Sequence, residues 1–498
     1  MLGDAVAYRF GLDDGAVEGP GPRVNILGSA PINATRLVRL LGDWLGTGDT
    51  LYEQLAERIR QLARTGTIPA GTRLPSERSL GTALGISRNT VARAFDELRA
   101  EGVLASRTGD GTYVVAGARN LVPDDDRLGS FASLADGAGQ RIDLRSAALP
   151  GLRMTADEIG SLDELRVRDL VASHGYLPAG LPELRAAIAS YYDDLGLPTE
   201  PEQILVTSGA QQALRLVASL HVAPGSVVAI EEPSFRGAIH SLRALGARLV
   251  GIPTGPSGLD VDALATTLAR VRPVLLVLQS TVHNPTGSVT DSLHRSRIAG
   301  LATRFGVPVV DDSTLADTVI DGDRTPLPLA AGSDLVITIG SMSKLFWGGL
   351  RVGWARAHPD LVERLTALKG GEDLGTSVIA QVIAARLLGR VEEARDERRA
   401  ILEKARRCVL DAVAALLPGW EPHVPAGGAS LWVRLPTVSA TAFAQRADRD
   451  SVRVLPGPTF SAFEGFDDHL RIAFSGPNDL TLRGIELLAG TWAGFVDG

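Results

Sequence analysis

"LVITIGSMSKLFWGGLRVGW", residues 335–354, begins as an apolar, strand-like run and continues into serines, glycines and one lysine, Lys344. Arg351 follows that lysine by seven positions. The chain contains 50 lysines and arginines, but only three of them are lysines: Lys344, Lys369 and Lys404. An arginine keeps its proton at any ordinary pH, whereas a lysine in apolar surroundings can lose it. The stretch therefore predicts an amine that acts in its neutral form.

From about residue 141 onward, apolar runs of this kind alternate with amphipathic helical runs. Six runs are strand candidates: QILVTSG (203–209), SVVAIEEP (226–233), ARLVGIP (247–253), PVLLVLQ (273–279), VPVVDD (307–312) and LVITIGS (335–341). Continuous apolar strands separated by helices are typical of a mainly parallel sheet that is covered on both faces. We therefore expect an α/β domain over most of the chain.

The composition limits the class of protein. A chain of 498 residues with 45% apolar residues is long enough for two to three units with large cores. Its net charge of −8 argues against a globally basic nucleic-acid-binding surface, although a local basic module is compatible with it. One cysteine, Cys408, excludes an intrachain disulfide. No apolar window of membrane-spanning length and no signal peptide is evident, so we expect a cytoplasmic protein without membrane contact.

Changes in composition divide the chain into four parts. Residues 1–34 are predicted to be a loose extension and residues 35–116 a small helical domain that ends in a hairpin. Residues 117–140 are polar, acidic and rich in glycine, as in a linker. Residues 141–498 form the α/β block.

The first block predicts a helix–turn–helix. "TLYEQLAERIRQLARTG" (50–66) places apolar residues on one helical face: Leu51, Leu55, Ile59 and Leu62. In "LPSERSLGTALGISRNTVARAFDELRAEG" (74–102), Gly85 separates two helices and Ser87 is a suitable N-cap for the second. The buried face of that second helix is predicted to hold Val91, Ala94, Phe95 and Leu98.

The opposite side of the second helix carries polar residues: Arg88, Asn89, Thr90 and Arg93. In a DNA-binding helix–turn–helix, this is the surface that meets base edges and phosphates. "VLASRTGDGTYVV" then predicts two short strands, a wing. Residues 36–116 hold 11 arginines against 9 acidic residues. The alternative to a DNA-binding domain is a small helical domain whose arginines are merely solvated.

Nearly all of this block resembles the winged helix–turn–helix of GntR-family regulators, most specifically in the LPSER and SRNTV segments. The resemblance implies double-stranded operator DNA as a partner. It implies DNA contacts from Arg78, Arg88, Asn89, Thr90 and the wing glycine Gly109.

Three motifs of the α/β block can hold a phosphate and an aromatic ring. "VTSGAQQAL" (206–214) ends a strand and opens a helix, so Ser208, Gly209 and Ala210 can offer donors to a phosphate, or form an ordinary strand–helix turn. Asn284, in "HNPTG", can hydrogen-bond a phenolic oxygen. The Asp311–Asp312 pair can keep a pyridine nitrogen protonated, or be a solvated strand end or helix cap.

The order and spacing of these motifs resemble fold-type I aminotransferases over roughly residues 140–490. That implies a mainly parallel sheet with a smaller C-terminal α/β subdomain, pyridoxal 5′-phosphate as cofactor, and no metal. The roles implied for the cofactor are an aldimine at Lys344, Asn284 at the ring O3′, Phe235 stacked on the ring, and Ser208, Gly209, Ala210, Ser341 and Arg351 at the phosphate.

Asp312 is placed at the pyridine nitrogen by a gap-free match to the family pattern, with Asp311 as the second choice. Arg471, in "DHLRIAFSGP", matches the arginine that clamps a substrate carboxylate, although an exposed strand-end arginine is the alternative. The chain departs from the pattern at Ser313-Thr314, where relatives place a tyrosine that meets O3′. That change puts ring electronics and turnover in doubt.

A GntR-type domain joined to an aminotransferase-like domain resembles the MocR subfamily of transcription regulators. The resemblance implies a head-to-tail homodimer that senses a small amino compound by aldimine exchange at Lys344. Because Arg471 favours ligands with a carboxylate, an amino acid is the first expectation. Two alternatives stay open: an aminotransferase that also binds DNA, and a DNA-binding protein whose large domain is only a dimerisation scaffold.

Overall fold

The computed structural model describes most of the chain. The described residues are 32–41, 44, 50–64, 67–68, 72–101, 103–107, 111–114, 141–162, 164–255, 257–322, 325–436, 439–463 and 465–496. The chain divides into two compact units, Met1–Gly129 and Ser130–Gly498. The predicted linker, residues 117–140, lies outside the described residues, as does most of the predicted extension.

The first unit is a helix–turn–helix followed by a two-stranded wing. Gly85 ends α3 in the left-handed conformation, at φ 68°, and the Ser87 side chain caps α4 by accepting a hydrogen bond from the Thr90 N–H. The two wing strands pair antiparallel. Its elements are α1 (Ala34–Leu41), α2 (Leu51–Arg64), α3 (Glu77–Leu84), α4 (Arg88–Ala100), β1 (Leu104–Arg107) and β2 (Gly111–Val114).

The core of this unit confirms the predicted helical faces, with one correction. The predicted α4 residues Val91, Ala94, Phe95 and Leu98 are buried, as are Leu55, Ile59 and Leu62 of α2. Leu51 was placed on the same face, but it is 45% exposed, because it is the first residue of α2 and lies beyond the packed turn. Ile32 packs into this core, so the folded unit includes residues before 35.

An eight-stranded sheet forms the centre of the second unit, and the predicted mainly parallel arrangement is confirmed. All six predicted strands are present. Only β11 and β7 run antiparallel to their neighbours. In spatial order the strands are β4 (Ile204–Thr207), β11 (Gly353–Arg356), β10 (Val336–Ser341), β9 (Val309–Asp312), β8 (Leu275–Leu278), β5 (Val227–Glu232), β6 (Arg248–Gly255) and β7 (Gly258–Leu259).

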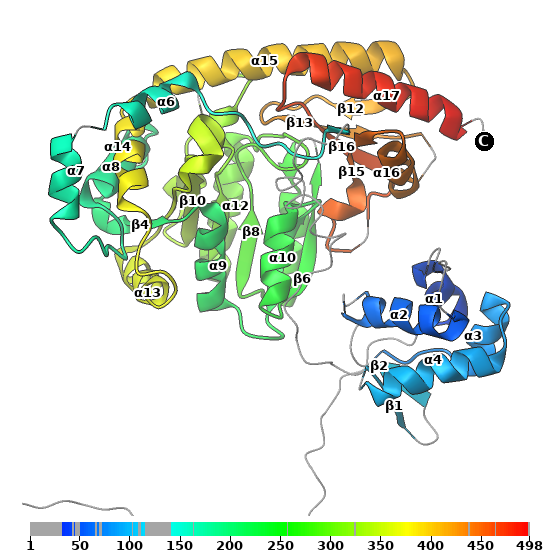
Figure 1. Ribbon diagram of the computed structural model, residues 1–498. Helices are drawn as coiled ribbons and strands as arrows, with labels where there is room; N and C mark the ends of the chain where they lie inside the picture. The colour runs from blue at the N-terminus through cyan, green and yellow to red at the C-terminus, as the bar shows by residue number, and fades with distance from the viewer. Residues whose placement is uncertain are drawn as a thin grey trace, which may run out of the picture. The chain divides into compact units, whose positions relative to one another are not determined.

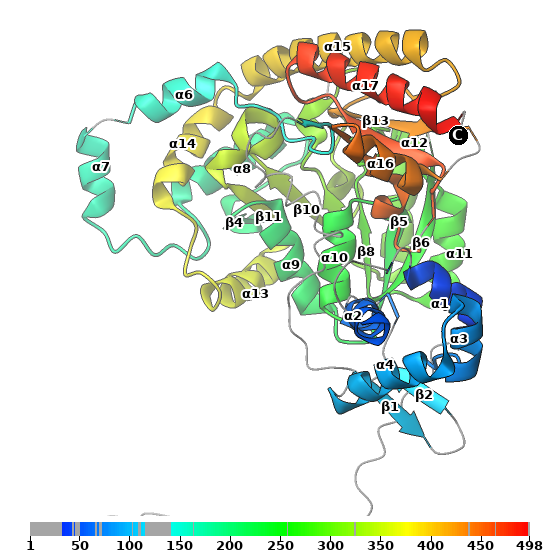
Figure 2. The same cartoon turned by 45° about the vertical axis from the view of Figure 1, so that its right-hand side comes forward.

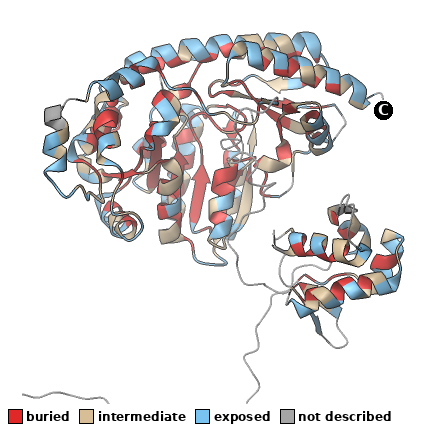
Figure 3. Cartoon of the chain, in the orientation of Figure 1, coloured by how far each residue is buried: buried red, intermediate tan, exposed pale blue. Residues whose placement is uncertain are grey.

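Helices cover both faces of this sheet (Figures 1 and 2). Burial explains the continuous apolar strands, because β4, β8, β9, β10 and β11 are buried at every residue (Figure 3). One core includes residues of α6 (Arg153–Gly160), α8 (Pro182–Asp194), α11 (Val261–Val271), α12 (Ser292–Phe305) and α14 (Val378–Leu388). The other core includes residues of α9 (Ala210–His221), α10 (Arg236–Ala244) and α13 (Pro359–Gly370). The short helix α7 (Glu164–Val171) follows α6.

A smaller α/β subdomain follows, as predicted. The long helix α15 (Val391–Leu416) packs against α17 (Asn478–Val496) and the two lie side by side (Figure 1). Its antiparallel sheet has the order β12 (Glu421–His423), β13 (Ser430–Arg434), β16 (His469–Ala473) and β15 (Leu455–Pro456), with α16 (Ala440–Arg449) beside it. Near it, β3 (Ile142–Asp143) pairs parallel with β14 (Val452–Arg453). In the part of the chain that is described, no helix is both long and apolar enough to cross a membrane.

Candidate functional site

Predicted site residues, together with Gln279, which was not predicted, meet at the carboxyl ends of the parallel strands. Ser208 follows β4, Gln279 follows β8, Asp312 ends β9 and Ser341 ends β10. In open α/β sheets, this edge is where ligands bind. The sequence separation of these residues, more than 130 positions, is thus bridged by the sheet.

The turn between β4 and α9 forms a cup with Arg351. Gly209 has φ 119°, and a Cβ there would lie 2.7 Å from Arg351 Nη2. Arg351 Nη2 donates to the carbonyl oxygen of Ser208 at 2.7 Å. The first N–H groups of a helix such as α9 have no partner within the helix, and the positive end of its dipole lies there. Ser208, Gly209, Ala210 and Arg351 therefore form a site suited to a phosphate.

Ser341 lies beside this cup but is buried, and its hydroxyl contacts that of Ser343 at 2.9 Å. Phe235 comes directly before α10 and lies near the cup. Its ring fills the space over Gly237, because a Cβ at Gly237 would be 2.4 Å from Phe235 Cε1 and 2.8 Å from Oε1 of Gln211, in the first turn of α9. The ring thus packs between the starts of two helices.

Lys344 lies in a short turn, Ser343–Trp347, after β10. Its Nζ donates to the carbonyl oxygen of Ala147 at 3.0 Å. Desolvation, followed by the charge of Arg471, lowers the pKa of Lys344 to about 8, while Asp312 opposes the shift and Arg398 adds to it. The other lysines differ: Lys369 is fully buried and bonds Asp373 at 2.6 Å, and Lys404 is exposed. Lys344 is the lysine that can supply a neutral amine near pH 8.

The two aspartates at the end of β9 have different partners. Asp311 is fully buried, and Ser280 occupies both its oxygens through its N–H at 3.0 Å and its hydroxyl at 2.8 Å. Asp312 accepts from the Thr314 N–H at 3.1 Å and from the Thr314 hydroxyl, both on Oδ1. Burial raises the pKa of the Asp312 carboxyl, and the hydrogen bonds from Thr314 oppose that rise. Asp312 Oδ2 has a single long contact to the described residues, from Gln279 Nε2 at 3.4 Å, and so has capacity to accept from a ring nitrogen.

Gln279 connects two of the candidate cofactor residues, and no sequence motif marks it. Its Nε2 lies 3.4 Å from Asp312 Oδ2, and its Oε1 accepts from the Asn284 N–H at 3.1 Å. Its own N–H donates to the buried Glu231 at 2.7 Å. Burial raises the pKa of Glu231 to about 8, so this carboxyl is protonated at neutral pH.

Arg471 is buried beside Asn284 and Lys344. Its Nη1 donates to Asn284 Oδ1 at 3.2 Å, and its Nη2 donates to the carbonyl oxygen of Arg145. Its buried Nε lacks a hydrogen-bond partner among the described residues, and its guanidinium lies 4.7 Å from the centre of the Phe460 ring. Desolvation, and then the charge of Arg236, lower the pKa of Arg471 to about 9. A buried guanidinium held by neutral oxygens alone is suited to receive a carboxylate. The alternative of an exposed strand-end arginine is wrong.

Residues 141–152, which we call the strap, cross this site. The strap follows the predicted linker directly in sequence. Its carbonyl oxygens at Arg145 and Ala147 accept from Arg471 and Lys344. Backbone hydrogen bonds fix it on both sides: Leu144 bonds Arg453 and Ala473, and Leu152 bonds Phe346.

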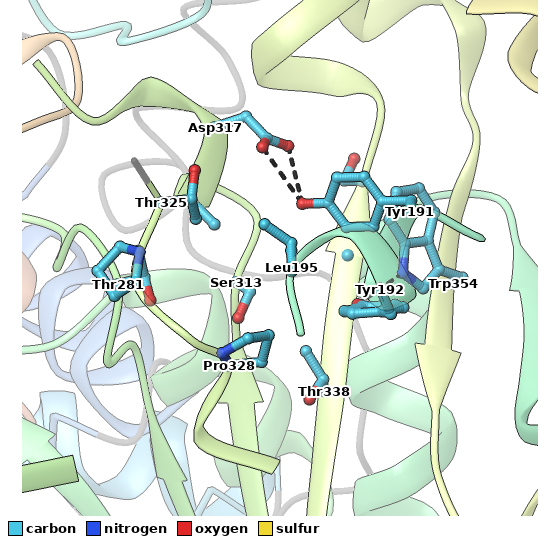
Figure 4. A pocket seen from close by; sticks show the side chains of 14 residues that line it. Tyr191, Tyr192, Leu195, Thr281, Ser313, Asp317, Thr325, Pro328, Thr338 and Trp354 are labelled. Atoms are coloured by element: carbon cyan, nitrogen blue, oxygen red, sulfur yellow. Dashed lines mark hydrogen bonds between the residues drawn. The ribbon is translucent and has the colours of Figure 1, made fainter. Parts of the chain in front are cut away.

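The two residues that replace the expected tyrosine point in different directions. Thr314 bonds Asp312, as described above, whereas Ser313 lines a cavity of about 20 Å³ beside Tyr192 and Thr338 (Figure 4). That volume holds about one water molecule. The Thr338 hydroxyl in it lacks a hydrogen-bond partner among the described residues. The Ser313 side chain therefore belongs to the α8 side of the sheet.

In the first unit, three of the predicted DNA-contacting side chains are exposed: Arg78, Arg88 and Asn89. Arg88 lies 3.4 Å from Glu77 with 71% of its side chain accessible. Thr90 is partly exposed, and its hydroxyl contacts that of Ser87 at 2.8 Å. Gly109 lies outside the described residues.

Two family models match the chain. Residues 160–486 match the model "Aminotransferase class I and II", and residues 51–114 match "Bacterial regulatory proteins, gntR family". The chain belongs to the class I and II aminotransferase family. With its GntR-type domain it is a transcription regulator of the MocR subfamily, as the sequence predicted.

Curated relatives include both regulators and enzymes. The 2-aminoadipate transaminase of Thermus thermophilus is 35% identical over 316 residues, 61% of this chain and 76% of the relative. The HTH-type transcriptional regulator YdfD of Bacillus subtilis is 26% identical over 454 residues, 86% of this chain and 94% of the relative. The probable rhizopine catabolism regulatory protein MocR of Rhizobium meliloti is 31% identical over 336 residues, covering 63% and 66%.

Among solved structures, LysN of Thermus thermophilus, an α-aminoadipate aminotransferase, has a TM-score of 0.65 and 29% identity, covering 74% of this chain and 99% of LysN. That structure holds N-(5′-phosphopyridoxyl)-L-leucine. Pyridoxal phosphate as the cofactor of this family is thereby confirmed.

The residues present fit this cofactor. Arg351 can approach the start of α9 only because residue 209 lacks a side chain. A buried acid, a partly buried amine and an amide lie at the neighbouring strand ends: Asp312, Lys344 and Asn284. In the described part of the chain, no cluster of three or more His, Cys, Asp or Glu side chains is arranged to hold a metal ion.

Proposed function

We propose that this regulator senses an amino acid at a pyridoxal phosphate site and changes its DNA affinity in response. The observation that supports the proposal is the strap: the first described residues after the linker touch both Lys344 and Arg471. A ligand that engages these two side chains must alter both contacts.

Each side chain has a defined task in this proposal. Ser208, Gly209, Ala210, Ser341 and Arg351 hold the phosphate, and Phe235 packs against the ring. Asp312 holds the proton of the ring nitrogen, and Asn284 orients O3′ through its free amide group. When bound, the cofactor supplies an aldehyde carbon that links reversibly to amines.

Lys344 would hold the cofactor through its neutral amine, and an incoming amino group would replace it there. Arg471 binds the ligand carboxylate and in doing so gives up its contact with the Arg145 carbonyl. Because the carboxylate is charged, it is a stronger partner for the guanidinium than a neutral carbonyl oxygen. The ligand therefore interacts more favourably with the protein when Arg471 is released from the Arg145 carbonyl than when it is bound there. Coupling between ligand binding and the position of the strap requires such a difference in interaction free energy.

Three measurements test the proposal. Borohydride reduction followed by peptide mapping should place the cofactor on Lys344, and label on Lys369 or Lys404 would refute the site. Mapping of bound sites across the genome should yield an operator. Titration with amino acids should then change operator affinity by about 5- to 150-fold, and a change of that size should vanish in Arg471→Gln.

For the assembly, we propose a head-to-tail homodimer. Large apolar side chains are exposed on the second unit, among them Tyr176 (61%), Leu374 (51%) and Trp347 (42%). Trp347 lies three residues after Lys344, so a partner that covers it approaches the site. A dimer would bind two operator half-sites related by symmetry. Sedimentation of the full chain should give twice the monomer mass of 52.4 kDa.

The second candidate is an aminotransferase that also binds DNA. It is favoured by the 35% identity to the Thermus transaminase and by the presence of Lys344, Asp312, Asn284 and Arg471. A screen of amino acids against common 2-oxo acids separates the two functions. Turnover in the usual enzyme range of about 1–10³ per second would favour the enzyme, whereas spectral changes without turnover favour the sensor.

A further inference from the structure

Arg398, in the middle of α15, is a buried cation that the site chemistry above does not use. Only 1% of Arg398 is exposed to solvent. All the hydrogen bonds that it makes to described residues go to backbone carbonyl oxygens. Burial lowers the pKa of its guanidinium to about 10, so it stays charged at neutral pH.

The carbonyl groups that Arg398 holds come from two segments. The oxygen of Leu345 accepts from Nε at 3.1 Å and from Nη2 at 2.8 Å, and the oxygen of Phe346 lies 3.4 Å from Nη2. These residues directly follow Lys344. The third oxygen belongs to Pro150 of the strap, 2.9 Å from Nη2. One guanidinium therefore joins the lysine turn to the segment that accepts the Lys344 hydrogen bond.

A structural role alone gives a poor account of this arrangement. A buried charge without a carboxylate partner is costly, and an apolar side chain of similar volume is often as stabilising or more so. The planar fork of arginine presents Nε and Nη2 to the Leu345 oxygen in a rigid geometry, whereas the three donors of a lysine ammonium rotate on a flexible stem. The arrangement thus fixes the geometry between two backbone segments at a cost in folding stability.

We propose that Arg398 is a positioning residue for Lys344, which clamps the turn that follows the lysine to the strap. The inference rests on the proposed function, because it takes Lys344 as the amine that binds the cofactor. When Lys344 leaves Ala147 to engage its ligand, Arg398 keeps turn and strap joined. A shift of the lysine turn is thereby transmitted to the strap, and so to the segment that continues into the linker.

Two variants and one matched control test the clamp. Arg398→Met removes the charge at similar length, and Arg398→Lys keeps the charge but not the fork. Arg407→Gln removes an arginine from the same helix, where it is exposed and pairs with Glu403 at 2.9 Å. Two quantities are to be measured for each variant. They are the pyridoxal phosphate dissociation constant, by absorbance, and the hydrogen exchange of residues 144–152, by mass spectrometry.

Both Arg398 variants should weaken cofactor binding about tenfold or more and speed exchange of the strap, whereas Arg407→Gln should match the unmodified protein. The pH midpoint of cofactor capture supplies a readout that a purely structural role would not move. Three charged groups face Lys344: Arg471 from β16, Asp312 from β9 and Arg398 from α15. Loss of the α15 charge in Arg398→Met should raise the midpoint, and Arg398→Lys should leave it in place.

The proposal is overturned if a folded Arg398→Met keeps both its cofactor affinity and its strap protection. It is also overturned if exchange rises uniformly across the second unit in both variants, since that pattern reports a general loss of stability. Failure of the proposed function gives a different result: borohydride would then leave Lys344 unlabelled in the unmodified protein as well.

Discussion

At the scale of single residues, Lys344 shows how surroundings set chemistry. Desolvation and two arginines oppose its charge, one carboxylate favours it, and the balance lowers its pKa to about 8. Capture of pyridoxal phosphate needs the neutral amine, so its rate should rise with pH, reach half its maximum near pH 8 and level off above. Stopped-flow absorbance measures this profile, with Lys344→Ala as the inactive control. A midpoint near 10.5, the ordinary lysine value, would contradict it.

Thr314 and Ser313 provide a second test at this scale. Thr314→Val removes the hydroxyl that bonds Asp312 Oδ1, so the buried carboxyl favours its neutral form more and stabilises a protonated ring nitrogen less. A lost hydrogen bond to a charged group costs about 1.5–3 kcal/mol, and cofactor affinity should fall roughly 10- to 100-fold. Ser313→Ala is the matched control, because Ser313 faces the α8 cavity. Equal effects of the two changes would refute the assignment.

The sequence predicted those residues of the candidate site that belong to recognisable motifs, namely Lys344, Asn284, Asp312, Arg351 and Arg471. It could not identify Gln279 or Arg398, since the contacts of each are with segments distant in sequence, which no local pattern encodes. Nor could it identify the Ala147 carbonyl, because any residue type offers the same oxygen. The buried state of Arg471 likewise depends on the strap, which lies 326 positions away from it at Arg145.

At the scale of elements, β11 packs edge-on against the turn that starts α9. A Cβ at Gly353 would lie 2.7 Å from the N atom of Ala210 and the Cα of Gly209, which are backbone atoms that cannot move aside. Gly353→Ala should displace the phosphate cup, lower the free energy of unfolding by about 1–3 kcal/mol and weaken cofactor binding. Gly348→Ala, with nothing within 4 Å, is the control. Thermal unfolding with and without cofactor measures both effects.

The recognition helix α4 supplies the second prediction for an element. Arg88→Ala should weaken operator binding by about 1–3 kcal/mol if Arg88 contacts a base, with relaxed specificity there. If it contacts only phosphate, binding should weaken equally on all sequences and the salt slope should shrink by about one. Arg99→Gln, at the other end of α4, is the comparison. Anisotropy titrations at several salt concentrations distinguish the two cases. If neither the operator affinity nor the salt slope changes, Arg88 is not part of the DNA interface.

The elements themselves were largely predictable. Six strands followed from continuous apolar runs, because both faces of a parallel sheet are buried. The strand β11 was missed: its four residues begin with a glycine and end with an arginine, and its antiparallel direction is fixed by partners at β4 and β10 rather than by its own pattern. Leu51 was placed wrongly because periodicity cannot tell where along a helix the packing partner ends.

At the scale of the whole molecule, the strap follows the wing in sequence after the predicted linker, so the candidate site and the DNA-binding unit share a covalent path. Adding pyridoxal phosphate and then a responsive amino acid should change hydrogen exchange of residues 144–152 in two steps. In Arg471→Gln the amino acid step should disappear. Exchange that is equal in all three states would show that the strap carries no signal.

The scarcity of lysine has a consequence for selectivity toward aldehydes. Pyridoxal phosphate reacts with any accessible neutral amine, so a surface rich in lysines would compete with the site and take up cofactor without producing a response. Of the three lysines, Lys369 is buried and bound to Asp373, and only Lys404 is exposed. Arginine supplies the remaining side-chain cations and does not react in this way. The protein therefore has few lysine amines that compete with Lys344 for an aldehyde. One equivalent of cofactor is then enough for its signal to come mainly from Lys344.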